Sequence, residues 1–287
     1  MAVNLTMKKF YRKATAEEFQ FYTEKLYPLQ DKVFEAASIY GDQIYLTGGT
    51  ALGRFYFNHR FSEDLDFFTN MDDLKRIVND LTARLKKKGF PLEIERVDVY
   101  FAQFYLITAD CRLKIDFVRE YNRIGELKKT DKGIYINDLE DIGSNKISAF
   151  EDRAEIKDII DLYVITQIIP IEKLFGLADV KRIPIAYEHL LTINVQGISG
   201  SALLTQDLDE GALSRFVDAL QLKTEAEIKK KERVALENIH DLIERLLWDF
   251  PYENRNINPY SIPVLRRRLS QLSLPKMRAL EKQLRSG

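Results

Sequence analysis

A glycine turn followed at short distance by two alternating acids constrains this chain more than any other feature of its sequence. The β-prone run 43–47 stops at Gly48-Gly49, and helical sequence follows. Asp64 and Asp66 then alternate with apolar residues in a second short run. Because side chains alternate along a strand, both carboxylates are expected to point to the same face. The pattern predicts a strand, a tight turn, a helix and then an acidic strand.

The alternating acids predict a metal site. Two carboxylates on one face repel each other unless a cation lies between them, and Asp116 in the β-prone run 112–119 offers a third. Magnesium prefers hard oxygen ligands and often keeps phosphate oxygens in its shell, so we expect magnesium, or manganese in its place. Asp116 would ligate a second ion or act as a base. The alternative is that Asp116 is an edge-strand acid paired with Lys114 or Arg112.

The paired glycines predict a phosphate beside the acids. Glycine lets backbone N–H groups approach an anion closely, and the positive end of the helix that starts near Thr50 would favour that anion. Thr50 is expected either to cap this helix or to donate its hydroxyl to a phosphate oxygen. The sequence leaves both readings open.

The order of the expected elements indicates an α+β fold. Residues 15–40 and 72–88 show helical spacing, and β-prone runs lie between them and after them. We expect an α/β domain with N-terminal helices at residues 1–135, which holds a small mixed β-sheet flanked by helices. A mostly helical domain at residues 136–287 is expected to follow and to close the active-site cleft. Its expected helices are 141–151, 154–167, 172–180 and 224–248.

Composition excludes several classes of protein. Apolar residues make up 45% and charged residues 30% of the 287 residues, a balance typical of a globular chain. Lys and Arg number 43 against 44 Asp and Glu, so a polyanion could be bound only by a local cluster of cations. A single cysteine, Cys111, excludes an internal disulfide, and no run approaches about 18 apolar residues. We therefore expect a cytoplasmic protein that does not enter a membrane.

Two segments together resemble a known family. The first comprises residues 48–52, Gly-Gly-Thr-Ala-Leu, and residues 59–66, His-Arg-Phe-Ser-Glu-Asp-Leu-Asp. The second is the helical segment 146–162, in which a lysine, an arginine and a Lys-Asp pair recur at the family's spacing. These segments resemble the AbiEii-type toxin nucleotidyltransferases, within the polymerase-beta-like nucleotidyltransferase superfamily. The resemblance covers roughly residues 40–170.

The resemblance implies a nucleotidyltransferase fold and an activity. Members transfer a nucleoside monophosphate from a nucleoside triphosphate with magnesium, act as toxins in toxin–antitoxin or phage-defence systems, and in some cases modify tRNA. For this chain the resemblance implies an RNA acceptor, with the 3′ end of tRNA as the expected target, so that translation would be blocked. A cognate antitoxin is the expected protein partner.

The resemblance also implies roles for individual residues. By the match, Asp64 and Asp66 are metal ligands, joined by Asp116, and Lys146 and Asp158 form the functional pair of the second motif. The candidate catalytic residues are therefore Asp64, Asp66, Lys146 and Asp158. The candidate nucleotide-binding residues are Gly48, Gly49, Thr50, Ser62, Lys146 and Arg153.

Structural readings compete with some of these roles. Asp158 and Asp161 lie on one helical face, and Lys157 can pair with Asp161 at i,i+4, so these residues could form a salt-bridge network. His59 and Arg60 are expected to support the site rather than react. Two other functions also remain open: nucleotide transfer to a protein or a small molecule, and a nucleotide-binding module without turnover. Labelling of RNA, protein or nothing would separate them.

Overall fold

The computed structural model is described in two units. The contacts within the chain group it into Met1–Thr224 and Glu225–Gly287. The expected division between residues 135 and 136 stays a prediction, although it falls at β8 (Tyr135–Ile136), the last strand of the larger sheet along the chain. The structure describes residues 10–183, 185–192, 198–209, 211–248 and 262–285.

The first unit opens with the expected helices. Helix α1 (Ala16–Phe21) starts at a capping box, in which Thr15 and Glu18 each accept a hydrogen bond from the other's backbone N–H, at 3.2 and 2.9 Å. The π-helical turn η2 (Tyr22–Leu26), α2 (Tyr27–Ala37) and the 3-10 segment η3 (Ser38–Gln43) continue it. The prediction of helix over residues 15–40 is confirmed.

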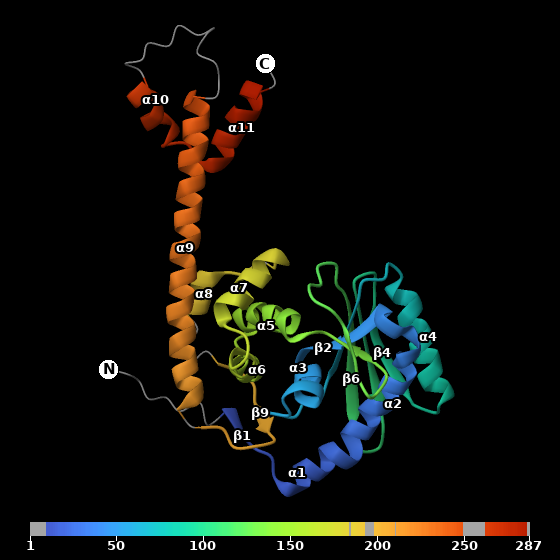
Figure 1. Ribbon diagram of the computed structural model, residues 1–287. Helices are drawn as coiled ribbons and strands as arrows, with labels where there is room; N and C mark the ends of the chain where they lie inside the picture. Colours follow the sequence, from blue (N-terminus) through green and yellow to red (C-terminus); the bar gives the residue numbers. More distant parts are fainter. Residues whose placement is uncertain (1–9, 184, 193–197, 210, 249–261, 286–287) are drawn as a thin grey trace. The chain divides into compact units, whose positions relative to one another are not determined.

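A seven-stranded mixed sheet forms the centre of this unit, in the order β4-β5-β6-β3-β2-β8-β7 (Figure 1). The pairs β3–β6 and β2–β8 are parallel, and the other neighbours are antiparallel. The α+β class is therefore confirmed. Besides β8, the strands of this sheet are β2 (Ile44–Thr47), β3 (Leu65–Thr69), β4 (Leu92–Val97), β5 (Phe101–Ile107), β6 (Arg112–Arg119) and β7 (Lys128–Lys129).

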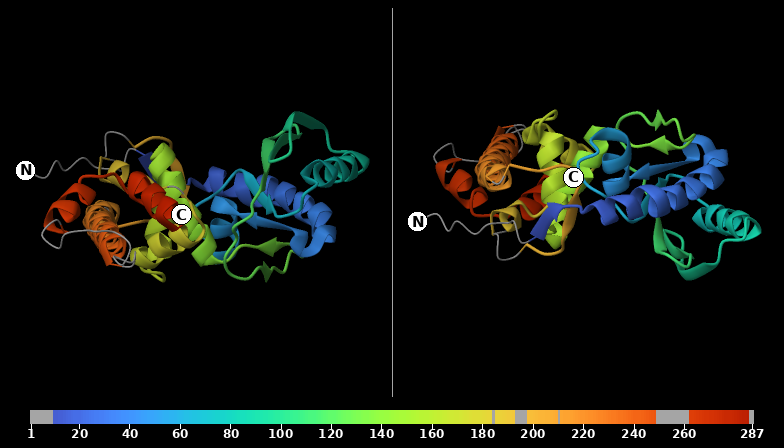
Figure 2. Two further views of the ribbon diagram at one scale, coloured as in Figure 1. Left: turned by 90° about the horizontal axis from the view of Figure 1, so that it is seen from above. Right: turned by 90° about the horizontal axis from the view of Figure 1, so that it is seen from below.

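The two faces of the sheet differ in burial. Every second residue of β3, β5 and β6 is buried, and the residues between them are partly or fully exposed. The buried face packs against α2 and α4 (Leu74–Lys87), with Phe34 edge-on to Phe67 at 6.4 Å and Phe67 stacked on Phe117 at 5.1 Å. Figure 2 shows α2 and α4 side by side. The opposite face of the sheet is more exposed and can therefore hold polar side chains.

A cluster of short helices follows the sheet. Helix α5 (Leu139–Arg153) packs against α6 (Ile156–Thr166) and α7 (Ile171–Val180), and α8 (Tyr187–Thr192) follows. Gly143 allows the close approach of α5 and α7, because a Cβ there would lie 2.7 Å from Cδ2 of Leu174. Helix α5 ends at Ala154 in the left-handed conformation, with φ of 47°. The helices expected at 141–151, 154–167 and 172–180 are thus confirmed.

A two-stranded parallel sheet was not expected from the sequence. It joins β1 (Tyr11–Lys13) to β9 (Ala202–Leu204). Strand β9 also borders the segment that precedes β3, since Phe61 N donates to Leu203 O at 2.9 Å. Both strands are three residues long, too short for an alternating pattern to stand out.

The second unit is helical. It contains most of α9 (Ala212–Trp248), with α10 (Ile262–Leu269) and α11 (Leu274–Arg285). Helix α9 begins earlier than the expected residue 224. The unit has a small core around Leu242, Ile243 and Met277. In neither unit does a described helix have the length and apolar character needed to cross a membrane.

The aromatic stack under the polar face makes a prediction about stability. Phe117 is fully buried against Phe67 and Phe104, so Phe117→Ala should lower the free energy of unfolding by about 3–5 kcal/mol. Urea denaturation would measure it. Ile94→Ala, at a residue of the same sheet that is 44% exposed, is the control and should change stability by less than about 1 kcal/mol. Equal effects of the two variants would contradict this packing.

Candidate functional site

The open face of the sheet carries a polar row across four strands. Thr47 of β2 lies opposite Asp66 of β3, Asp66 opposite Asp116 of β6, and Asp116 opposite Gln103 of β5. Gln103 donates to Asp116 Oδ1 at 2.9 Å. Asp64 immediately precedes β3. The strand register therefore places Asp66 and Asp116 side by side.

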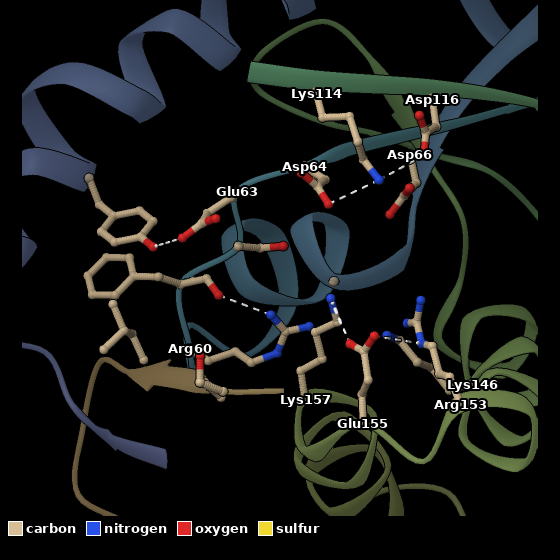
Figure 3. A pocket seen from close by; sticks show the side chains of 17 residues that line it. Arg60, Glu63, Asp64, Asp66, Lys114, Asp116, Lys146, Arg153, Glu155 and Lys157 are labelled. Carbon is tan, nitrogen blue, oxygen red and sulfur yellow. Dashed lines mark hydrogen bonds and ion pairs between the residues drawn. The ribbon is translucent and has the colours of Figure 1, made fainter. Parts of the chain in front are cut away.

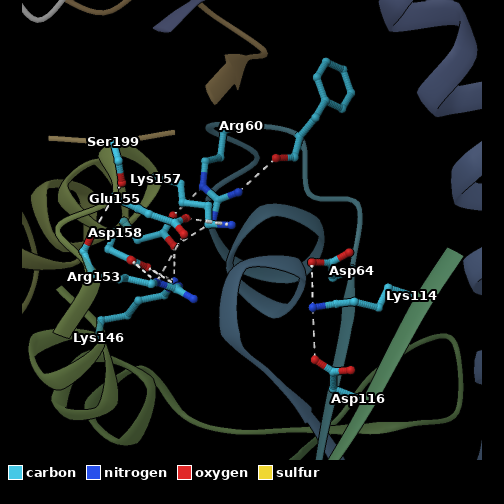
Figure 4. A network of polar contacts seen from close by, with 12 residues as sticks. Arg60, Asp64, Lys114, Asp116, Lys146, Arg153, Glu155, Lys157, Asp158 and Ser199 are labelled. Atoms are coloured by element: carbon cyan, nitrogen blue, oxygen red, sulfur yellow. Dashed lines mark hydrogen bonds and ion pairs between the residues drawn. The ribbon is translucent and has the colours of Figure 1, made fainter. Parts of the chain in front are cut away.

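Lys114 lies between two of the acids (Figure 4). Its Nζ is 3.3 Å from Asp64 Oδ2 and 3.0 Å from Asp116 Oδ2. The pairing of Asp116 with Lys114 thus exists, but β6 is an inner strand and not an edge strand. Arg112 pairs instead with Glu93 at 3.1 Å. The metal role of Asp116 stays a prediction.

Asp66 and Lys114 have shifted pKa values. Burial, together with the charges of Asp116 and Asp64, raises the pKa of Asp66 above its usual value, because each of these disfavours a further negative charge. Burial opposes the charge of Lys114, but Asp64 and Asp116 outweigh it and raise the pKa of Lys114. Within the described part of the chain, no group of three or more Asp, Glu, His or Cys is arranged to hold a metal ion.

The glycine turn packs tightly against charged side chains. Gly48 has a φ of 68°, and a Cβ there would lie 2.6 Å from Asp66 Oδ2. A Cβ on Gly49 would lie 2.4 Å from Arg60 Nη2 and 3.0 Å from Ser62 Oγ. Real Cβ atoms do not come this close, and the left-handed conformation further favours glycine at the first position. The turn therefore requires both glycines.

Thr50 joins the turn to the acidic strand. Its side chain is fully buried, and its hydroxyl donates to the backbone oxygen of Asp64. The short helix α3 (Gly48–Ala51), continued by the π-helical turn η4 (Leu52–Tyr56), has Thr47 at its N-cap position. The cap expected from Thr50 is therefore wrong, because the helix begins two residues earlier. Its contact with a phosphate stays a prediction.

Two fully buried carboxylates of α6 hold the cations of the site, and Figure 4 labels one of them, Asp158, beside Lys146 and Arg153. Asp161 binds Arg60 in a bidentate pair, with Nε–Oδ1 and Nη2–Oδ2 both at 2.7 Å. Lys146 Nζ lies 2.8 Å from Asp158 Oδ1 and 2.7 Å from Asp161 Oδ2. Arg153 also binds Asp158, with Nε at 2.7 Å from Oδ2. Lys146 and Asp158, the pair to which the resemblance assigns a function, are thus in direct contact within a larger salt-bridge network.

The network is stabilised by mutual neutralisation. Burial alone would raise the pKa of Asp161, but the charges of Arg60 and Lys146 outweigh it and hold that pKa well below its usual value. Burial lowers the pKa of Lys146, but the charges of Asp161 and Asp158 outweigh it and raise the pKa. His59 Nε2 lies 2.8 Å from Asp161 Oδ1, which fits the expected supporting role.

The salt-bridge network considered from the sequence is present, but Lys157 is not paired with Asp161. Lys157 Nζ lies 2.9 Å from Glu155 Oε2 at the partly exposed start of α6. The Asp161 carboxylate points instead to cations of the segment before β3 and of α5, as the contacts above show. Spacing on one helix could not reveal these partners, because they come from other segments.

A cavity of about 430 Å³ joins the acids to these cations (Figure 3). Thr50 and Asp158 do not line it, since both lie behind the residues they support. Lys114, Glu155 and Lys157 line it but had not been assigned a site role. The predicted residues that line it are Gly49, Ser62, Asp64, Asp66, Asp116, Lys146 and Arg153.

A smaller and more apolar pocket of about 160 Å³ adjoins the cavity. The two share Asp66, Lys146 and Arg153. Gly48 lines only the smaller one, together with Phe68 and residues of α5. The sequence did not indicate the smaller pocket, because isolated apolar residues of one strand and one helix form no recognisable pattern.

The buried network makes a prediction about stability. Asp161→Asn would leave Arg60 without its buried counter-charge and Lys146 with Asp158 alone, so the free energy of unfolding at pH 7 should fall by about 3–5 kcal/mol. Because the folded-state pKa of Asp161 lies below the usual value of 3.8, its contribution is fully present above that value. It is lost as pH falls through the lower folded-state pKa. Urea denaturation between pH 7 and about pH 3 would measure both effects.

Asp207→Asn is the matched control for this prediction. Asp207 pairs with Lys13 at 2.9 Å, but its side chain is 82% exposed. An exposed pair contributes at most about 1 kcal/mol. A loss in the Asp161 variant no larger than in the Asp207 variant would rule out the network as a major source of stability.

Comparisons with known proteins agree with this geometry. MenT4, a nucleotidyltransferase toxin from Mycobacterium tuberculosis H37Rv, is similar in structure, with a TM-score of 0.56 and 16% identity over 95% of this chain and 94% of that chain. The crystal structure of a protein from H. pylori is also similar, with a TM-score of 0.50 and 22% identity, over 77% of this chain and 99% of that chain. At these identities the likeness shows the fold.

The sequence itself identifies the family. A search of curated proteins gave no match. The model of the family described as "Nucleotidyl transferase AbiEii toxin, Type IV TA system" matches residues 32–249. This match covers the glycine turn, the acids and the buried network, and it extends over more than half of the chain. The chain therefore belongs to the AbiEii family of nucleotidyltransferase toxins of type IV toxin–antitoxin systems.

Proposed function

We propose that this nucleotidyltransferase toxin transfers a nucleoside monophosphate from a nucleoside triphosphate to RNA, at the 3′ end of tRNA, and so blocks translation. The observation that carries the transfer chemistry is the joint lining of one cavity by three neighbouring acids and by Lys146 and Arg153. Acids suit a divalent cation, and the cations suit a triphosphate. The RNA acceptor rests on the family resemblance.

Asp64, Asp66 and Asp116 are the residues that would hold magnesium or manganese. Their carboxylate oxygens are the hard ligands that these ions prefer, and the raised pKa of Asp66 reflects negative charge that a cation would offset. The bound ions would neutralise the triphosphate and lower the pKa of the attacking hydroxyl. The donor set therefore fits a divalent metal by its chemistry.

The two pockets suggest how the nucleotide lies. Gly49, Ser62, Lys146 and Arg153 line the larger cavity and would bind the triphosphate there. Asp158 does not reach the cavity and would position Lys146 and Arg153 from behind. The nucleoside would occupy the smaller pocket, whose wall includes Phe68. Asp66, Lys146 and Arg153 border both pockets and would face the α-phosphate.

Positioning and charge account for the proposed reaction. The RNA hydroxyl oxygen attacks the α-phosphorus, the bond from that phosphorus to the bridging oxygen of the β-phosphate breaks, and pyrophosphate leaves. The hydroxyl proton passes to a carboxylate, for which Asp116 is our candidate. Arg153 and Lys146 bind the phosphate oxygens on which negative charge develops. The buried partners of these cations fix their geometry before substrate arrives.

A cognate antitoxin would control this activity in the cytoplasm, where tRNA is found. It would act by blocking the site or by modifying the enzyme. Co-expression of the toxin with its gene neighbour would test this partner by rescue of growth.

Labelling of RNA tests the proposed function. Purified protein with magnesium, each α-labelled triphosphate in turn and total RNA should place label in tRNA. Asp66→Asn should lower the rate at least about 100-fold, because metal-assisted stabilisation amounts to several kcal/mol and each 1.36 kcal/mol is about tenfold in rate. Removal of the divalent metal with a chelator should abolish the reaction.

The control is Asp110→Asn, which removes an exposed acid paired with Lys25 and outside both pockets. It should label at the wild-type rate. Label in protein or in a small molecule would place the acceptor elsewhere, and intact labelling by the Asp66 variant would refute the metal assignment.

A further inference from the structure

The acids proposed to hold metal already have a cation among them. Lys114 lies two residues before Asp116 on β6, so strand alternation places both side chains on the open face of the sheet. Its ammonium bridges Asp64 and Asp116 at 3.3 and 3.0 Å, as Figures 3 and 4 show. The bridge joins the segment before β3 to β6.

The ammonium and a divalent ion cannot share these oxygens. Magnesium binds carboxylate oxygens at about 2.0–2.1 Å, so an ion on Asp64 and Asp116 would lie within a few ångströms of Lys114 Nζ. Like charges at this separation repel strongly in a partly buried site. Lys114 and a divalent ion on Asp64 and Asp116 would therefore compete for the same two carboxylates.

A bound triphosphate would offer Lys114 an alternative to its carboxylate partners. Its side chain is 29% exposed and lines the cavity of about 430 Å³, which Gly49 and Lys146 also line. A triphosphate in this cavity would offer oxygens to an ammonium that had lost its carboxylates. The long and flexible lysine stem allows such a change of partner without a change in the strand.

We propose that Lys114 is a built-in counter-ion, which neutralises Asp64 and Asp116 in the free protein and exchanges them for triphosphate oxygens when metal and nucleotide bind together. The inference rests on the proposed function, because it takes a metal-bound triphosphate as substrate. Lys114 is then a positioning residue that couples the binding of the metal to the binding of the triphosphate. Metal alone then binds weakly, and each ligand strengthens the binding of the other.

Binding of Mn²⁺ tests this exchange without any turnover. Electron paramagnetic resonance of free Mn²⁺ would give its Kd for the full chain, alone and with an α,β-methylene nucleoside triphosphate. Lys114→Met removes the competing charge and should bind Mn²⁺ alone about tenfold more tightly than wild type, a change equivalent to about 1.4 kcal/mol. The tightening of Mn²⁺ binding by the triphosphate should be larger in wild type than in this variant.

Lys157→Met is the matched control. Lys157 lines the same cavity, but its ammonium pairs with Glu155 at 2.9 Å and not with the three acids. It should leave the Kd of Mn²⁺ alone within about twofold of wild type, well below the tenfold step. Lys114→Gln keeps a polar side chain without the charge and should also bind Mn²⁺ alone about tenfold more tightly than wild type. It takes the place of Lys114→Met if the methionine variant does not fold.

The outcomes separate the inference from the proposed function. If Mn²⁺ binds wild type and both Lys114 variants equally, and Asp66→Asn abolishes binding, the counter-ion role is overturned while the metal site stands. If Mn²⁺ binds none of these proteins with or without triphosphate, both the metal-dependent function and the counter-ion role are overturned. Tighter binding in the Lys114 variants together with weaker coupling supports the exchange.

Discussion

The buried carboxylate of Asp161 is the interaction on which the rest of the site depends. It binds Arg60 from the segment before β3 and Lys146 from α5, so it joins three parts of the chain in one place. Charges at this depth are stable only when paired, because the interior solvates them poorly. Arg60 in turn packs against Gly49 so closely that no Cβ fits between them. The glycine turn is thus held through Arg60 by a carboxylate that lies 101 residues after Arg60 in the chain.

The site consists of two charge groups that face each other across one cavity. On the sheet, Asp64, Asp66 and Asp116 outnumber Lys114. Around α5 and α6, Lys146 and Arg153 together with Arg60 of the segment before β3 outnumber Asp158 and Asp161. Each group has a residual charge of its own sign, which attracts the opposite charge of a ligand. A substrate that combines a divalent cation with a polyanion matches both groups at once. This local arrangement is possible in a chain with a net charge of −1.

Local patterns in the sequence predict the elements of the site, but not its long-range contacts. Strand period and turn chemistry were sufficient for the glycine turn and for β3 and β6, whereas the pairing of Asp66 with Asp116 comes from the sheet register. The resemblance added Lys146 and Asp158, which lie in contact. The bidentate pair of Arg60 with Asp161 and the sheet of β1 with β9 depend on tertiary packing, which one sequence does not encode as a local pattern. The same limit applies to Thr50 and Lys157. The Thr50 hydroxyl donates to the backbone oxygen of Asp64, and the Lys157 ammonium pairs with Glu155.

The pairing of β1 with β9 has a consequence for the synthesis of this toxin. Tyr11 pairs with Ala202, so the first strand finds its partner only after about two-thirds of the chain has been made. The segment that carries Arg60 is likewise bordered by Leu203 and held by Asp161. Chains emerge from the ribosome in order, and contacts between distant residues form last. The cavity is therefore completed only when β9 has joined the fold, because Ala202 and Leu203 line it.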